Sequence, residues 1–122
     1  MSTALQEYTN HLSSIEQEIN NHPAWHGRMS GLSAEKLLRG RKTPYLYIIR
    51  AGENEMDYYV TFVLPDLSIR HQPFVITVTP QGWYFENAAA TGPFNLAASI
   101  DDVLHLIMHC EKGSNTAKVF SK

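Results

Sequence analysis

The sequence predicts an α+β domain with a central antiparallel β-sheet flanked by two helices and one further helix at the N-terminus. Two observations favour this fold class. Near both ends of the chain, apolar residues recur at spacings of three and four, which is typical of helices with one buried face. The middle of the chain instead holds apolar and aromatic runs separated by short turn sequences, and strands that follow one another in this way form an antiparallel meander.

Three segments have the pattern of amphipathic helices. The first ends before Pro23, and its apolar stripe is expected to pack on the domain that follows, although a helical dimer or a partner contact would use the same positions. The second, Gly31–Arg39, has Ser30 as its N-cap and Gly40 as its stop, and the third begins at Ser99. The apolar positions of the first helix are Leu5, Tyr8, Leu12, Ile15 and Ile19, and those of the third are Ile100, Val103, Leu104, Ile107 and Met108.

Extended runs follow the second helix in close succession, at residues 45–49, 58–64, 67–79 and 82–85. The first is apolar throughout, as expected for a central strand that is buried on both faces. Pro73 in the third run indicates a break or an edge position, because proline cannot donate to a strand ladder. The chain is accordingly divided into an N-terminal amphipathic helix (1–22), a main domain (23–111) and a C-terminal tail (112–122), in which residues 118–120 could add a small strand.

Charge and cysteine content limit the possible partners and compartments. Ten basic and twelve acidic residues give a net charge of -2, so bulk attraction to nucleic acid or to acidic membranes is not expected. The single cysteine, Cys110, allows no internal disulfide and fits a reducing compartment. The sequence has no apolar run that could span a bilayer and no signal-peptide pattern. We therefore expect a cytoplasmic, monomeric protein, in a host cytoplasm if it is exported by a route without such a signal.

Catalytic and metal-binding motifs are weak or absent in the sequence. It contains no Gly-Xaa-Ser-Xaa-Gly, P-loop or paired His-Glu motif, so we expect neither an enzyme nor a cofactor. His105, His109 and Cys110 approach a zinc spacing, but Cys110 lies about 100° round the helix from His109 and no second ligand pair follows. Trp25 and Trp83 could stack on bases, but no basic groove accompanies them. A small acyl- or metal-dependent enzyme remains a distant alternative.

Arg50, at the end of the first apolar run, is the most informative residue. Side chains alternate along a strand, so Arg50 is predicted to share a face with Leu46 and Ile48, at the edge of the core. A cation there is costly unless it has an anionic partner, and the guanidinium fork matches a carboxylate or a phosphate. The loop that follows, residues 51–57, can turn backbone N–H groups toward the same anion. The sequence leaves open whether that anion is an internal carboxylate or an external phosphate.

Several motifs resemble those of Src-homology-2 (SH2) domains, in the same order and over roughly residues 24–110. Trp25-His26-Gly27 resembles the entry motif, and residues 34–38 look like the first conserved helix. Tyr47-Ile48-Ile49-Arg50 resembles the Phe-Leu-Val-Arg signature, and Ile69-Arg70-His71 resembles the strand whose histidine lines the phosphotyrosine pocket. Residues 58–62, 83–85 and 99–104 look like the remaining strands and the final helix.

The resemblance implies a module that binds tyrosine-phosphorylated proteins and lacks catalysis. Arg50 would grip the phosphate bidentately, with support from His71, Thr61, the hydroxyl of Ser30 and the loop residues Gly52, Glu53 and Asn54. The expected peptide contacts are Arg70, Gln72, Phe94, Leu96 and Trp83.

The chain departs from the family pattern at three positions of the pocket. Gly31 stands where many members carry a second phosphate-contacting arginine, Gly52 where the signature has a serine, and Pro73 where some members carry a lysine. Residues 87–98 are longer than the family pattern suggests, and we expect this loop to clamp the peptide with broad sequence selectivity. Such divergence resembles SH2 domains found outside animals, including those of some intracellular bacterial pathogens. The alternative is a helix-mediated protein-interaction module with a decayed phosphate pocket.

Overall fold

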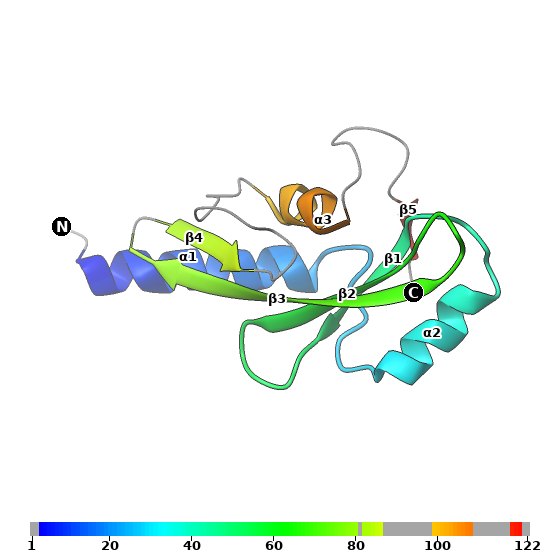
Figure 1. The fold of residues 1–122 in the computed structure, drawn as a ribbon. Helices are drawn as coiled ribbons and strands as arrows, with labels where there is room; N and C mark the ends of the chain where they lie inside the picture. The colour runs from blue at the N-terminus through cyan, green and yellow to red at the C-terminus, as the bar shows by residue number, and fades with distance from the viewer. Residues whose placement is uncertain (1–2, 81, 87–98, 109–117, 121–122) are drawn as a thin grey trace.

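The computed structural model describes residues 3–80, 82–86, 99–108 and 118–120. No helix in these ranges has the length and apolar character needed to cross a bilayer. The order of helices and strands confirms the α+β class (Figure 1). In chain order the elements are α1 (Ala4–Asn20), α2 (Gly31–Arg39), β1 (Leu46–Ala51), β2 (Asp57–Val63), β3 (Ile69–Thr79), β4 (Gly82–Glu86), α3 (Ile100–Met108) and β5 (Lys118–Val119).

The strands form one sheet in the order β4-β3-β2-β1-β5. β1 to β4 make the predicted antiparallel meander, and β5 pairs in parallel with β1. The short strand predicted within residues 118–120 is therefore present at the edge of the sheet. The register aligns Arg50 with Tyr59 across β1 and β2, and Thr61 with His71 across β2 and β3. Side chains from three neighbouring strands can therefore meet on one face.

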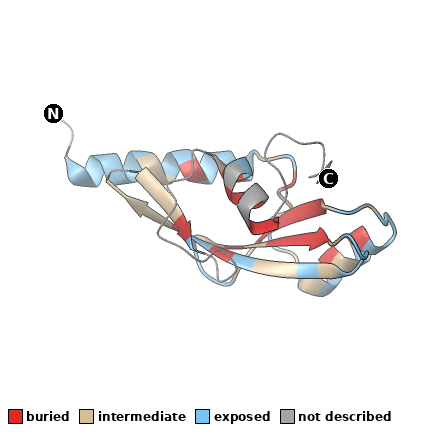
Figure 2. Ribbon diagram, turned by 45° about the horizontal axis from the view of Figure 1, so that its top comes forward, coloured by how far each residue is buried: buried red, intermediate tan, exposed pale blue. Residues whose placement is uncertain are grey.

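Helices cover both faces of the sheet: α1 and α3 lie on one side and α2 on the other (Figure 1). α2 contributes Ala34 and Leu38 to a small core on its own side. The apolar stripe of α1 packs on the domain as expected, but only in the second half of the helix. The first half is exposed (Figure 2), and Leu5 there is 74% exposed. The helical residues in the larger core are Ile15, Ile19, Ile100, Val103, Leu104, Ile107 and Met108.

The central strand β1 divides the two cores, as its apolar sequence predicts. Leu46 and Ile48 lie in the core under α2, whereas Tyr47 and Ile49 lie in the core under α1 and α3. The strand begins one residue later than predicted, because Tyr45 has a φ of 64° and belongs to the preceding turn. It also continues through Ala51, so that Arg50 lies within the strand and not after it.

Pro73 occupies an edge position, and the alternative prediction of a break is wrong. β3 runs without interruption over Ile69–Thr79. β4 pairs with β3 only from Val75 onward, so at Pro73 the outer side of β3 faces no strand of the described segments. The missing N–H of proline therefore removes no bond from the ladder between β3 and β4.

The end of α1 and the start of α3 are joined by two polar contacts. The carboxylate of Glu18 accepts a hydrogen bond from the backbone N–H of Ile100. His22 Nε2 lies 2.8 Å from Asp101 Oδ1, and His22 Nδ1 accepts the N–H of Ala24 at 3.0 Å. Since Nδ1 accepts, Nε2 carries the proton that bonds Asp101. The two helices are thus connected by hydrogen bonds as well as by the apolar core.

Candidate functional site

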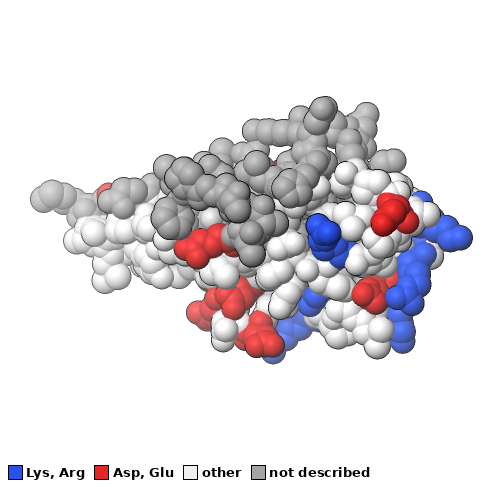
Figure 3. All heavy atoms as spheres, in the orientation of Figure 1, with Lys and Arg blue, Asp and Glu red and all other residues white. Residues whose placement is uncertain are grey.

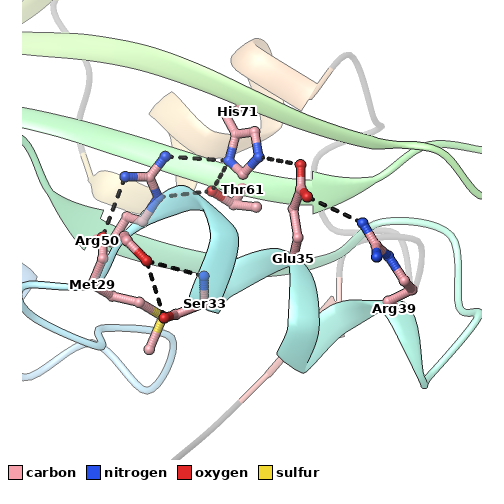
Figure 4. Close-up of polar contacts among 8 residues, drawn as sticks. Met29, Ser33, Glu35, Arg39, Arg50, Thr61 and His71 are labelled. Carbon is pink, nitrogen blue, oxygen red and sulfur yellow. Dashed lines mark hydrogen bonds and ion pairs between the residues drawn. The ribbon is translucent and has the colours of Figure 1, made fainter.

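Arg50 lies on the α2 side of the sheet, on the same face as Ile48, as its position in the strand predicts. Its side chain is nearly buried, with 8% of the residue exposed. Nε donates to Thr61 Oγ1 at 3.0 Å, Nη1 to the Met29 carbonyl at 3.4 Å and Nη2 to His71 Nδ1 at 3.2 Å (Figure 4). The structure therefore brings together three of the predicted phosphate contacts, Arg50, Thr61 and His71.

Every hydrogen-bond partner of Arg50 in the described segments is electrically neutral. The carboxylates that contact basic side chains there are Asp101, which contacts His22, and Glu35, which contacts Arg39 and His71. None of them lies within ion-pair distance of the Arg50 guanidinium. Burial lowers the pKa of Arg50 from its usual value, because desolvation penalises the charged form. The internal ion pair considered from the sequence is thus not found within the described ranges.

Two donors of the Arg50 guanidinium remain available. A guanidinium has five N–H groups, and the bonds to Thr61, Met29 and His71 use three of them. One N–H is left on Nη1 and one on Nη2. Two neighbouring terminal nitrogens with one free N–H each form the fork that binds two oxygens of a single anion.

Tyr59 of β2 closes one side of the guanidinium, with Arg50 Cζ 4.3 Å from the centre of its ring. Such stacking over an aromatic face stabilises a cation without neutralising it. The two residues line an open depression of about 570 Å³ whose other walls come from the segment before α2 and from the loop between β1 and β2. Its remaining lining residues are Arg28, Met29, Ser30, Ala51, Gly52 and Glu53.

His71 is fixed by groups on both of its ring nitrogens. Its Nδ1 faces Arg50 and also lies 2.9 Å from Thr61 Oγ1, while its Nε2 lies 2.8 Å from Glu35 Oε1. The second carboxylate oxygen of Glu35 accepts a bond from Arg39 Nη2 at 3.1 Å (Figure 4). The hydrogen bond with His71 and the charge of Arg39 lower the pKa of Glu35, although desolvation opposes this shift. A chain of contacts therefore runs from the surface of α2 to the guanidinium.

The N-terminus of α2 lies beside the guanidinium. Ser30 is the N-cap, as predicted: its Oγ accepts the N–H of Ser33 at 3.1 Å and donates to Ser33 Oγ at 3.0 Å. A Cβ added to Gly31 would lie 3.3 Å from His71 Cε1 and 3.4 Å from Arg50 Nη2. The absence of a side chain at Gly31 thus leaves space directly above one of the available donors, next to the positive end of a helix dipole.

The loop between β1 and β2 supplies fewer amides than expected. The N–H of Gly52 donates to the Asp57 carbonyl at 2.8 Å, so in this conformation it cannot also bind an anion. A Cβ on Gly52 would lie 2.8 Å from Asp57 atoms, which explains why serine is absent here. The Asn54 side chain bonds Asp57 Oδ2 at 3.1 Å. No acceptor in the described ranges takes the backbone N–H of Glu53 or Asn54, and both residues are exposed.

The predicted peptide contacts are less well gathered. On β3, Arg70 is exposed and Gln72 is half-buried, whereas Trp83 of β4 packs against the larger core. Phe94 and Leu96, with the rest of the 87–98 loop, lie outside the described residues. The weak zinc candidates His109 and Cys110 also lie outside them, and the described side chains contain no group of three potential metal ligands.

Charge is unevenly distributed around the site (Figure 3). Acidic side chains gather over the loop between β1 and β2, which contains Glu53 and Glu55 and is followed by Asp57 at the start of β2. Lysine and arginine gather at the end of the molecule where α2 lies. An approaching anion is thus attracted from the α2 side and repelled from the loop side.

The sequence interpretation placed Gly31 in the pocket but missed Glu35, Tyr59 and the Met29 carbonyl as parts of the site. Glu35 precedes Arg39 by four residues, a spacing that indicates an ordinary surface pair on a helix.

No protein-family model matches the chain, and no curated protein is detectably similar to it.

Proposed function

We propose that this chain binds a phosphate group at Arg50 and that the phosphate belongs to a phosphotyrosine of a partner protein. The supporting observation is a nearly buried guanidinium whose partners are neutral and whose two terminal nitrogens each keep one available N–H. A dianionic phosphate would supply the missing charge and two acceptor oxygens together. The protein would act as a binding module without catalysis.

The burial of Arg50 favours a long side chain, such as tyrosine, over serine or threonine as the carrier of the phosphate. Arg50 is only 8% exposed at one wall of an open depression of about 570 Å³. Met29, Ser30 and Glu53 line the same depression. A phenyl ring extends the phosphate away from its backbone and would fill the depression beside Tyr59. The similarity of the sequence motifs to those of SH2 domains supports the same choice.

Within this proposal, each residue has a distinct role. Arg50 binds two phosphate oxygens with its end-on N–H pair, and Tyr59 restricts the movement of its guanidinium. Thr61 and His71 orient the same group from its other side. The backbone amides of Glu53 and Asn54 are further candidate donors to the phosphate. Arg70 and Gln72 on β3 are candidate contacts for the peptide. A cytoplasmic location in a reducing compartment would fit the single cysteine.

The deciding experiment is a calorimetric titration with matched phosphorylated and unphosphorylated tyrosine peptides. We expect only the phosphorylated peptide to bind. Arg50→Ala should weaken binding by about 2–5 kcal/mol, since it removes a partly desolvated charge pair. Arg50→Lys should also bind poorly, because lysine has no planar fork.

A matched control is Arg41→Ala, which removes an exposed arginine that stacks on Phe120 away from the site. It should bind like wild type. Thermal unfolding should show that Arg50→Ala remains folded, because the substitution removes no internal ion pair. Equal binding of wild type and Arg50→Ala would reject the proposed mechanism.

A second candidate function is supported by the first turns of α1. Leu5 is 74% exposed and Tyr8 is 38% exposed, and both belong to the apolar stripe of the helix. These residues favour the alternative of a partner contact made by the helix. Replacing both by serine should leave phosphopeptide affinity unchanged, so partner binding that survives Arg50→Ala and fails with these replacements would favour the alternative.

A further inference from the structure

We propose that Glu35 is a positioning residue of the anion site: its carboxylate selects one tautomer of His71 and, through that ring, orients the Arg50 guanidinium with its end-on N–H pair open to a ligand. The proposal rests on the proposed function, because it concerns the same site and the same anion. Glu35 would thus assist phosphate binding, although its negative charge by itself repels an anion.

The tautomer follows from the partners of the two ring nitrogens. Arginine has only donors, so the 3.2 Å contact between Arg50 Nη2 and His71 Nδ1 requires a lone pair on Nδ1. An ionised carboxylate has only acceptors, so the 2.8 Å contact with Glu35 Oε1 requires a proton on Nε2. Both conditions hold only for the neutral ring with its proton on Nε2. Either the other tautomer or the imidazolium would place a donor against the guanidinium.

Thr61 completes the arrangement from β2. Its Oγ1 accepts the Arg50 Nε–H at 3.0 Å, so its own proton is free to point at His71 Nδ1, 2.9 Å away. The Nδ1 lone pair therefore holds Arg50 directly and also through Thr61. The loss of that lone pair would remove the contact with Arg50 Nη2 and the acceptor that orients the Thr61 hydroxyl. The position of the proton on the His71 ring therefore determines whether Nδ1 can accept from Arg50 and orient its guanidinium.

Glu35 is itself held in place. It lies on α2 one turn after Gly31, its side chain is 27% exposed, and its second oxygen is fixed by Arg39 Nη2 at 3.1 Å. The ionisable groups in contact with His71 within the described segments are Glu35 from α2 and Arg50 from β1. Of these two groups, only the Glu35 carboxylate can accept a hydrogen bond from Nε2–H and so favour the tautomer with its proton on Nε2.

The proposal predicts an effect opposite in sign to that of charge alone. Glu35 carries a negative charge near an anion site and would repel a phosphate, so by charge alone its removal should strengthen phosphate binding. If Glu35 positions the site, its removal should weaken binding. Glu55 provides the matched control, because it is an exposed carboxylate in the loop between β1 and β2 and forms no hydrogen bond with His71 or Arg50.

The test measures the affinity for a phosphotyrosine peptide by calorimetry. Glu35→Ala should bind about tenfold more weakly, which is the scale of one hydrogen bond to a charged group. Glu35→Gln should lose less, because its amide oxygen can still accept from Nε2. Glu55→Gln should bind as well as wild type or better. In a His71→Ala background, Glu35→Ala should cause no further loss, since a residue that acts through His71 has nothing left to position.

A spectroscopic measurement separates positioning from a general structural effect. Imidazole ¹⁵N shifts in the ligand-free protein should report the Nε2–H tautomer for His71 in wild type, with the signal assigned from the spectrum of His71→Ala. Glu35→Ala should shift the ring toward the other tautomer or toward an average of the two. An unchanged tautomer, stronger binding by Glu35→Ala, or additive losses in the double variant would overturn the proposal.

The same measurements distinguish the failure of this inference from the failure of the proposed function. If wild type binds the phosphopeptide and Glu35→Ala binds equally well, only the positioning role is wrong. If wild type does not bind the phosphopeptide, the proposed function fails and the role of Glu35 in anion binding fails with it. In that case the shift measurement still decides whether Glu35 controls the tautomer.

Discussion

Arg50 is a cation whose stability in the folded protein depends on neutral groups. Its contacts with Thr61, Met29 and His71 replace water as acceptors but supply no countercharge. Desolvation therefore lowers the pKa of Arg50, although the group stays charged at any physiological pH. The hydrogen bonds and the Tyr59 ring offset part of the cost of burying this charge, and a bound anion would offset more of it.

Tyr58, next to the aligned pair of Arg50 and Tyr59, provides a test of burial at the residue scale. Desolvation, followed by the charges of Glu16, Asp57 and Glu55, raises its pKa to about 12. Since the folded pKa lies above the ordinary value near 10, the unfolded chain ionises first as pH rises. This group therefore stabilises the fold fully below about pH 10 and loses that contribution as pH increases toward about 12.

Tyr58→Phe isolates this pH effect, because it keeps the ring that stacks on Phe74 and removes only the hydroxyl. The free energy of unfolding, measured by urea at about pH 9 and about pH 11, should fall more steeply for wild type than for the variant. Identical slopes for the two proteins would mean that Tyr58 ionises in the folded state as it does in the unfolded chain.

Residue chemistry was predictable from the sequence where a single strand determines it. Arg50 follows an apolar run, so alternation alone placed it at the edge of a core, and the motif order identified His71 and Thr61 as neighbours. Glu35 was not predictable as part of the site, and the reason for a glycine at position 52 was not predictable either. Glu35 meets His71 only because α2 crosses β3, and Gly52 is required by its close approach to Asp57, and neither contact leaves a local pattern in the sequence.

At the scale of elements, α2 both covers one face of the sheet and shapes the site. Ala34 and Leu38 bury its inner face, which fixes the positions of Gly31 and Glu35 on the same helix. Its ends were predictable from Ser30 and Gly40, because capping is a local property. The start of β1 was less predictable, since the positive φ of Tyr45 depends on its bond from N–H to the Val63 carbonyl on the neighbouring strand.

The cap of α2 separates the two roles considered for Ser30. Ser30→Ala should lower the free energy of unfolding by about 1 kcal/mol, because the N–H of Ser33 loses its acceptor. Ser33→Ala keeps that N–H and removes only a hydroxyl, so it should have a smaller effect. Urea unfolding of the two variants measures this difference.

Phosphopeptide affinity of the same variants tests the other role of Ser30. The Ser30 hydroxyl already donates to Ser33 Oγ and accepts the N–H of Ser33. The affinity of Ser30→Ala for the phosphopeptide should therefore change by less than about threefold. A much larger loss for Ser30→Ala, with Ser33→Ala unaffected, would instead make Ser30 a direct phosphate contact.

At the scale of the whole molecule, the N-terminal helix belongs to the main core. Ile15 and Ile19 are 1% and 0% exposed and lie in the same cluster as the buried face of α3. The amphipathic pattern predicted a buried stripe, but it could not show which half of the helix would be covered. That division depends on how far the sheet extends beneath α1, which is a property of the assembled fold.

Ile19→Ala should therefore destabilise the entire domain. Removal of a fully buried isoleucine leaves a cavity, and the free energy of unfolding should fall by about 2–5 kcal/mol. Leu5→Ala on the same helix changes a residue that is 74% exposed and should have an effect within about 0.5 kcal/mol. Single urea transitions monitored by two probes provide the comparison, and a negligible effect of Ile19→Ala would show that α1 unfolds separately.

The two contacts between α1 and α3 have a consequence for synthesis of the chain on the ribosome. The contacts of Glu18 with Ile100 and of His22 with Asp101 cannot form until α3 has been synthesised, long after α1 has left the ribosome. The strands β1 to β4 lie next to their sequence neighbours and can pair as they appear, with α2 already available for one face. Among the described elements, only α1 can cover the other face of the nascent sheet until α3 is made. During that interval its apolar side chains are open to chaperones and to misassociation, and α1 is the segment that limits this exposure.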